Sequence, residues 1–283
     1  MVILLGLAAA VLYGSGDFLG GMATRKAHVL AVLTIVEIAA VITALSIAVI
    51  WPGPVSLAGL AWGIGAGLAG GLGLIIFYIG LAAGPMSVVA PVAGLVSTIL
   101  PVAVALAEGE QPGAGVSAGA LLCLVAIVLA SSAGHTSAPR AGSAGLARAI
   151  GYGIASGALF GLFFLLIRNA GQSGALWAVA AGRIGELAIV LIAAVVLRRG
   201  LPSRGTGGRL LLMAAGAGVI DVVANVCYVA ATRTGMFGLA VVLSSLYPGV
   251  TVLLARVVLG ERLRWVQRVG LGLAVIGILL VAS

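Results

Sequence analysis

Ten apolar stretches, each long enough to cross a lipid bilayer as a helix, follow one another along this chain of 283 residues. A bilayer core of about 30 Å requires roughly 20 apolar residues in helical form. Only short polar connectors separate the stretches, and charged residues make up 8% of the chain, against about 25% in a soluble domain. The pattern therefore excludes an ordinary soluble protein. The predicted spans are 1–23, 29–51, 57–83, 86–107, 114–133, 149–167, 175–197, 209–231, 236–259 and 265–282.

One segment interrupts this pattern. Residues 134–148 are small, polar and contain a proline, which is typical of a linker. Five spans lie on each side of it, so we expect a first five-helix repeat at 1–133 and a second at 149–283. An odd number of spans per repeat inverts the second repeat relative to the first. Inverted repeats with a binding site near the bilayer midplane are typical of secondary transporters.

Two glycine–glutamate pairs support an internal repeat. Gly84 and Glu110 are 26 residues apart, and so are Gly235 and Glu261. Each glycine opens a predicted span, and each glutamate follows one. The expected fold is an all-α integral membrane protein with ten transmembrane helices, arranged as two inverted five-helix repeats.

Glycines in the third predicted span favour close helix packing. Gly63, Gly67 and Gly71 recur every four residues, a spacing that lets helix backbones approach each other in lipid. The run does not predict a phosphate-binding loop, because no Lys-Ser or Lys-Thr pair follows it.

Basic residues gather in one set of connectors. The connectors after the odd-numbered spans, together with the span ends beside them, hold twelve Lys and Arg, whereas the connectors after the even-numbered spans hold two, Arg168 and Arg233. The more positive side of a membrane protein usually faces the cytoplasm. The net charge of +8 is therefore interpreted as an orientation signal rather than a nucleic-acid-binding surface. Taken literally, the asymmetry between the two sets of connectors places both termini outside the cytoplasm.

Five ionisable residues fall inside predicted spans and are the candidates for binding chemistry. A charge at mid-membrane costs about 2.5–3.5 kcal/mol on insertion scales, so such residues normally face a cavity or a partner. Asp221, Asn225 and Tyr228 share one helix face by their spacing. This polar stripe suits a polar substrate or a proton-binding carboxyl; the alternative is an interhelical polar clamp. The five ionisable residues are Asp17, Glu37, Arg183, Glu186 and Asp221.

The spacing of these residues leaves several roles open. Arg183 and Glu186 are three residues apart and can pair locally, either as a structural pair or as an arginine that orients a carboxylate substrate. Glu37 lacks such a partner, because Thr34 stands where the second half has Arg183. It either pairs across the bundle or stays protonated. Asp17 lies among glycines and either lines the site or reaches the interface.

The five residues sum to a charge of −3 when all are ionised. An apolar bundle would not hold this charge uncompensated, so either some carboxyls carry protons or the site attracts a cation. Both options fit proton-coupled export of an amine-bearing substrate. The predicted proton-coupling residues are Glu37, Glu186 and Asp221. With two tyrosines that could line a cavity, the predicted substrate-binding residues are Asp221, Asn225, Tyr228, Asp17, Tyr13, Tyr78 and Arg183.

The run 235–260, followed by Glu261-Arg262-Leu263, resembles the penultimate-helix motif of EamA-type members of the drug/metabolite transporter superfamily. Pro248 stands for the mid-helix proline of that motif, and Glu108-Gly109-Glu110 is a looser copy of its exit. Tyr13-Gly14-Ser15 resembles the Trp-Gly-Ser start of the first helix in this family. The resemblance implies ten spans around a central cavity and alternating access. It also implies cytoplasmic termini, opposite to the charge count, so the sidedness stays open.

The other function classes find less support. Both histidines lie in connectors and the two cysteines stand alone, so there is no catalytic constellation. We therefore expect no enzyme, no cofactor and no bound metal. The alternative is a Mg²⁺ carrier or a channel-like protein, since Mg²⁺ prefers a few carboxylates, which Asp17, Glu37 and Asp221 would supply. The expected partners are a small-molecule substrate, the lipid bilayer and protons, for a monomer or homodimer in the bacterial cytoplasmic (inner) membrane.

Overall fold

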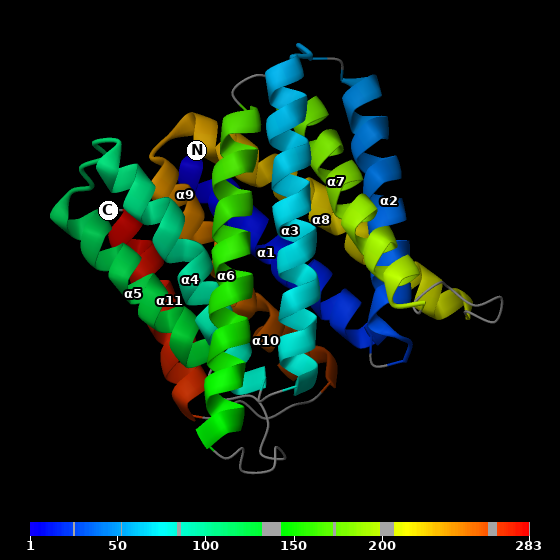
Figure 1. The fold of residues 1–283 in the computed structure, drawn as a ribbon. Coiled ribbons are helices and arrows are strands. Elements are labelled where there is room, and N and C mark those ends of the chain that lie inside the picture. Colours follow the sequence, from blue (N-terminus) through cyan, green and yellow to red (C-terminus); the bar gives the residue numbers. More distant parts are fainter. Residues whose placement is uncertain are drawn as a thin grey trace.

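The computed structural model describes residues 1–24, 26–51, 53–83, 86–131, 143–171, 174–198, 207–259 and 265–282. In these ranges the chain forms eleven α-helices and no strand (Figure 1). The helices are α1 (Val2–Thr24), α2 (Val29–Ile50), α3 (Leu57–Ala83), α4 (Met86–Ala107), α5 (Ala114–Ser131), α6 (Ser143–Gly171), α7 (Ala175–Val196), α8 (Gly208–Thr234), α9 (Phe237–Ser244), α10 (Tyr247–Leu259) and α11 (Trp265–Ala282).

The helices form where the predicted spans lie, with one difference in the penultimate span. That span consists of α9 and α10, which are separated at Ser245 and Leu246. Pro248 has no N–H and cannot bond the carbonyl of Ser244, so a continuous helix would lose a hydrogen bond there. By length and composition, six described helices suffice to cross a membrane, and shorter apolar helices accompany them. The expected all-α bundle of about ten spans is therefore roughly matched.

The predicted linker is shorter in the structure than in the sequence analysis. The first helix of the second half, α6, already begins at Ser143, so residues 143–148 are helical; residues 134–142 lie outside the described part. The apolar pattern underestimates α6 because Arg148 and Arg168 interrupt it near both ends. Long basic side chains extend along a helix toward the membrane surface, so a helix can continue beyond its apolar core.

Large apolar side chains cover the outside of the bundle. Leu212, Val257 and Leu279 are exposed by 75%, 79% and 63%. Apolar patches of this extent are not tolerated on monomeric soluble proteins, whereas in a bilayer they face lipid. Together with the apolar helices, they define a multi-pass membrane protein.

Helices of the two halves pack mainly against each other. α3 packs against α6 and α7, α8 against α1 and α2, and α4 against α6; α5 pairs with α11. Small residues permit the closest approaches: a side chain at Gly67 would overlap the carbonyl of Gly182, and one at Gly218 would overlap the carbonyl of Val36. The glycines at 63, 67 and 71 all meet α7. The close packing expected from their spacing is thus confirmed.

Both termini lie at the same end of the bundle (Figure 1). There Val2 packs against Gly235, and Leu280 lies beside Gly115. We call this the terminal end. α1, α3, α5, α7 and α10 run toward the opposite end (Figure 1). The segments that follow them in the sequence, except the one after α3, hold most of the Lys and Arg. We call this opposite end the basic end.

Candidate substrate site

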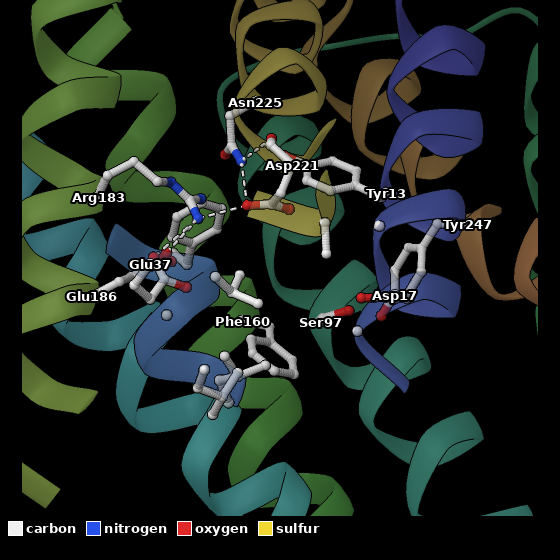
Figure 2. Close-up of a pocket in the computed structure, with 18 of the residues that line it drawn as sticks. Tyr13, Asp17, Glu37, Ser97, Phe160, Arg183, Glu186, Asp221, Asn225 and Tyr247 are labelled. Carbon is white, nitrogen blue, oxygen red and sulfur yellow. Dashed lines mark hydrogen bonds and ion pairs between the residues drawn. The ribbon is translucent and has the colours of Figure 1, made fainter. Parts of the chain in front are cut away.

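A cavity of about 160 Å³ lies within the bundle. Eight helices line it: α1, α2, α3, α4, α6, α7, α8 and α10; no described residue of α5, α9 or α11 does. Figure 2 shows Arg183, Glu37 and Glu186 on one side and Tyr247 and Asp17 on the other. The polar lining residues are Tyr13, Asp17, Glu37, Ser97, Arg183, Glu186, Asp221, Asn225 and Tyr247.

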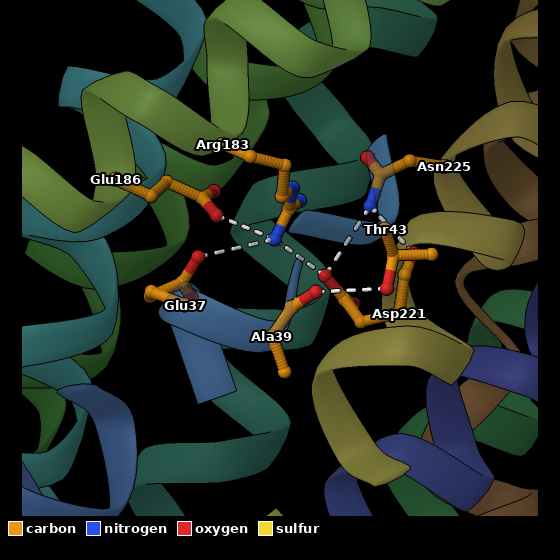
Figure 3. Close-up of polar contacts among 7 residues, drawn as sticks. All are labelled: Glu37, Ala39, Thr43, Arg183, Glu186, Asp221 and Asn225. Atoms are coloured by element: carbon orange, nitrogen blue, oxygen red, sulfur yellow. Dashed lines mark hydrogen bonds and ion pairs between the residues drawn. The ribbon is translucent and has the colours of Figure 1, made fainter. Parts of the chain in front are cut away.

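Arg183 is the centre of an ion-pair cluster that joins three helices (Figure 3). Its Nη1 atom lies 2.5 Å from Glu186 Oε2, 2.5 Å from Asp221 Oδ2 and 3.7 Å from Glu37 Oε2. The local pair with Glu186 agrees with the sequence spacing. Glu37, on α2, approaches Arg183 across the bundle, which is one of the two alternatives left open for it. The link to Asp221 on α8 had no counterpart in the sequence.

The cluster holds more negative than positive charge. Three carboxyls face one guanidinium, and Arg183, Glu37 and Glu186 are only 4%, 2% and 6% exposed. Burial is costly for any charge that lacks a partner. Glu37 is held least firmly, because its Oε2 atom makes no hydrogen bond.

The three residues of the polar stripe on α8 have different surroundings: two of them line the cavity, and the third packs between helices. The Nδ2 group of Asn225 donates to the Asp221 carbonyl at 2.9 Å and lies 3.4 Å from Oδ2 of the same residue. The buried Oδ1 atom of Asn225 has no hydrogen-bond partner. Tyr228, by contrast, is buried outside the cavity, and its hydroxyl donates to the Phe164 carbonyl at 3.3 Å. The interhelical role weighed for this stripe therefore describes Tyr228, while Asp221 and Asn225 line the cavity.

The residues expected on α1 both line the cavity. The buried hydroxyl of Tyr13 has no hydrogen-bond partner, and its ring meets Tyr247 edge-on, with centroids 6.3 Å apart. Asp17, one turn along α1, has an exposed side chain. None of the hydrogen bonds or ion pairs between described residues involves its carboxylate. Tyr78 belongs to α3, but its side chain lies outside the described part.

The sequence analysis did not predict the aromatic part of the cavity wall. Phe160, Phe163 and Phe164, all on α6, line the cavity, and Phe163 packs edge-on against Phe164 at 5.5 Å. Their spacing of three and four residues puts them on one helix face. That pattern was visible in the sequence, but an apolar face in a membrane span equally predicts contact with lipid.

Comparisons with known proteins agree with this architecture. Residues 147–283 match the family model described as the EamA-like transporter family. A solved crystal structure of a protein is similar over 99% of this chain and 95% of its own chain, with a TM-score of 0.76 and 18% sequence identity. At that identity the likeness shows the fold alone. No curated protein matches the chain.

The fold and the matched half define a membrane transporter of the drug/metabolite type. The second part of the chain, residues 147–283, matches the EamA-like transporter family, which agrees with the resemblance seen in the sequence. Members of this family are transporters rather than enzymes. The matched segment contributes Arg183, Glu186 and Asp221 to the cavity, so the charged cluster is largely built from it.

Proposed function

We propose that this protein is a secondary active exporter of small polar metabolites, such as amino acids or amine-bearing compounds and drugs, in the bacterial cytoplasmic membrane. The observation that carries the proposal is the buried cluster of Arg183, Glu37, Glu186 and Asp221 beside a cavity inside the bundle. Ionisable residues this deep in a membrane protein are rare and usually mark a substrate or ion pathway.

An amine-bearing substrate suits the charge of the cavity. With all carboxyls ionised, the cluster carries two surplus negative charges, and Asp17 adds one more. A positively charged ammonium group compensates this surplus, and the nearby phenyl rings of α6 offer faces that attract cations. The open acceptor on Asn225, Oδ1, is placed to bind an N–H group of the same substrate.

Proton coupling follows from the same surplus. Glu37 and Glu186 both meet the same Arg183 Nη1 atom, at 3.7 and 2.5 Å, and like charges held this close at one buried cation favour a proton on one of them. If a proton and a substrate amine compete for the same carboxyls, each displaces the other. This mutual exclusion produces exchange, in which protons move inward as the substrate moves outward.

Alternating access is supported by the way the halves pair. α3 packs against α6 and α7, and α8 packs against α1 and α2; α4 packs against α6, while α9 and α10 pack against α1. The counterparts in the two halves are α1 and α6, α2 and α7, α3 and α8, and α4 and the pair α9–α10. When each helix is replaced by its counterpart, each of these contacts becomes another contact of the same set. That is the pattern expected for inverted repeats related by a pseudo-twofold axis, between which one repeat rocks against the other.

A divalent-cation carrier is less well supported. No group of three or more His, Cys, Asp or Glu among the described residues is arranged to hold a metal ion. Arg183 also sits between the three carboxyls that a divalent cation would need, and its positive charge repels such a cation. The amine substrate therefore remains the better candidate.

The test is export by cells that express the wild type or Asp221→Asn. We expect the wild type to raise the extracellular level of an amine-bearing compound, measured by mass spectrometry of the medium. We expect Asp221→Asn, at equal abundance, to lose this export. Asp221→Glu keeps the charge and serves as the matched control, retaining part of the activity. Equal export by wild type and Asp221→Asn would contradict the proposed site.

A further inference from the structure

The terminal end of the bundle is closed by contacts that cross between the two halves. Glu110, in the connector between α4 and α5, accepts hydrogen bonds from the backbone N–H groups of Phe237 (2.5 Å) and Gly238 (3.0 Å). These are the first N–H groups of α9, which have no partner within the helix. A carboxylate is also favoured at this position by the helix dipole. Glu110 thus holds the start of α9 from the opposite half.

A second contact strengthens the same closure. Arg168, near the end of α6, lies over the ring of Phe237 with its Cζ atom 4.1 Å from the centroid. It also pairs with Glu108 at 2.7 Å. One short connector, carrying Glu108 and Glu110, therefore holds both the end of α6 and the beginning of α9.

The short helix α9 separates the cavity from the terminal end. All eight of its residues are buried, and none lines the cavity, whereas Tyr247, the first residue of α10, does. Leu243 packs so closely on α1 that a side chain at Gly6 would lie 2.9 Å from its Cβ atom. On α1, α2 and α3, the lining residues nearest the terminal end are Tyr13, Glu37 and Gly70, so along these three helices the cavity extends from about mid-helix toward the basic end.

The junction between α9 and α10 is weakly held. The hydroxyl groups of Ser244 and Ser245 are buried without a hydrogen-bond partner, and Pro248 cannot bond the carbonyl of Ser244. Three backbone hydrogen bonds remain at the junction, from Ser245 to Val241, from Leu246 to Leu243 and from Gly249 to Leu246. Rotation about residues 245–246 breaks these local bonds and no side-chain hydrogen bond of Ser244 or Ser245. The two ends of α9 differ accordingly: a charged contact fixes its beginning, and a hinge follows its end.

We propose that α9 is the gate at the terminal end and that Glu110 is its latch. Opening the cavity toward that end moves α9 about residues 245–246 and releases the N–H groups of Phe237 and Gly238 from the carboxylate. This inference rests on the alternating access in the proposed function. It goes further in assigning the gate to one eight-residue helix and its release to one side chain.

The gate is tested with a reporter that needs no substrate. Ser97 lines the cavity, and Ser97→Cys, in a background without Cys123 and Cys227, reacts with a membrane-impermeant maleimide only when the cavity is open to the side of addition. We expect Glu110→Gln to raise the labelling rate from the terminal side roughly tenfold, equivalent to about 1.4 kcal/mol. An unchanged rate in a folded Glu110→Gln protein overturns the proposal.

A cross-link provides the converse test. A Cβ atom on Gly238 would lie 3.2 Å from Cβ of Ala105, near the separation in a disulfide. Oxidation of the pair Ala105→Cys and Gly238→Cys should abolish terminal-side labelling of residue 97, read by peptide mass, and reduction should restore it. The matched control is Gly277→Cys with Cys123 retained, which joins α11 to α5 away from the cavity. Its oxidation should leave labelling unchanged; labelling that persists in the oxidised gate pair overturns the proposal.

Failure of the gate and failure of the export function give different results. If labelling responds as expected but no amine is exported, the gate stands and the proposed function fails. If export persists with the gate pair oxidised, the gate fails while the exporter stands.

Discussion

Arg183 faces more negative charge than it can neutralise, and every one of its ion pairs passes through a single atom, Nη1. The sequence could place Arg183 beside Glu186, because three residues separate them on one helix. It could not place Asp221 or Glu37 there, because contacts between helices depend on how each helix is rotated in the bundle. The ionisable residues of the site were thus predictable, and their shared partner was not.

Removing Arg183 should be more harmful than removing any one carboxyl. Arg183→Gln leaves three buried carboxyls without a cation, and breaking a buried pair in this way costs about 3–5 kcal/mol. We expect a strongly lowered melting temperature in detergent, measured by fluorescence-detected size exclusion after heating. Asp221→Asn should be much milder, since it reduces the surplus charge. Combining it with Arg183→Gln should recover part of the loss; a single Arg183→Gln variant as stable as the wild type would refute this account.

At the scale of helices, the sequence predicted positions well and interruptions less well. Periodic apolar runs locate a span because the bilayer fixes its length. The break between α9 and α10 was not predicted, although Pro248 was visible, because a proline in a membrane span can also produce only a kink. The latch on α9 was missed for another reason: Glu110 acts on a helix that begins 127 residues later in the chain.

Some glycines allow close helix contacts and others face open space, and substitution with alanine should distinguish the two kinds. A Cβ atom at Gly67 would overlap the Gly182 carbonyl on α7, whereas nothing lies within 4 Å of one at Gly20. We expect Gly67→Ala to force α3 and α7 apart and to lower the melting temperature by several degrees. Gly20→Ala should be neutral or stabilising, because alanine favours a helix by about 1 kcal/mol over glycine. Equal effects of the two substitutions would show that close packing of α3 on α7 is not required.

At the scale of the whole molecule, the even number of spans puts both termini at one end (Figure 1). The side of the membrane that this end faces is a separate question. By sequence, twelve of the fifteen Lys and Arg lie in or beside the segments that follow the helices ending at the basic end, and a positive end usually faces the cytoplasm. The proposed inverted orientation of the two halves rests on the count of spans per half, which comes from the sequence, and on the pairing of helices across the halves, which comes from the structure.

The charge asymmetry predicts that the termini face away from the cytoplasm. Alkaline phosphatase, which is active only outside the cytoplasm, should therefore be active when fused after Ser283. Green fluorescent protein at the same position should stay dark when exported unfolded through the general secretion route. The opposite pair of results would place the basic end outside the cytoplasm, so the cavity would extend toward the outside of the cell.

The pairing of helices across the two halves has a consequence for the synthesis and membrane insertion of the protein. α1, α3 and α4 find their main partners in α8, α6 and α7, and in α6 respectively, all of which leave the ribosome later. Until the second half is inserted, the glycine-rich helix faces of the first half are therefore expected to contact lipid. We therefore expect each half to complete its packing only after the other half has been inserted.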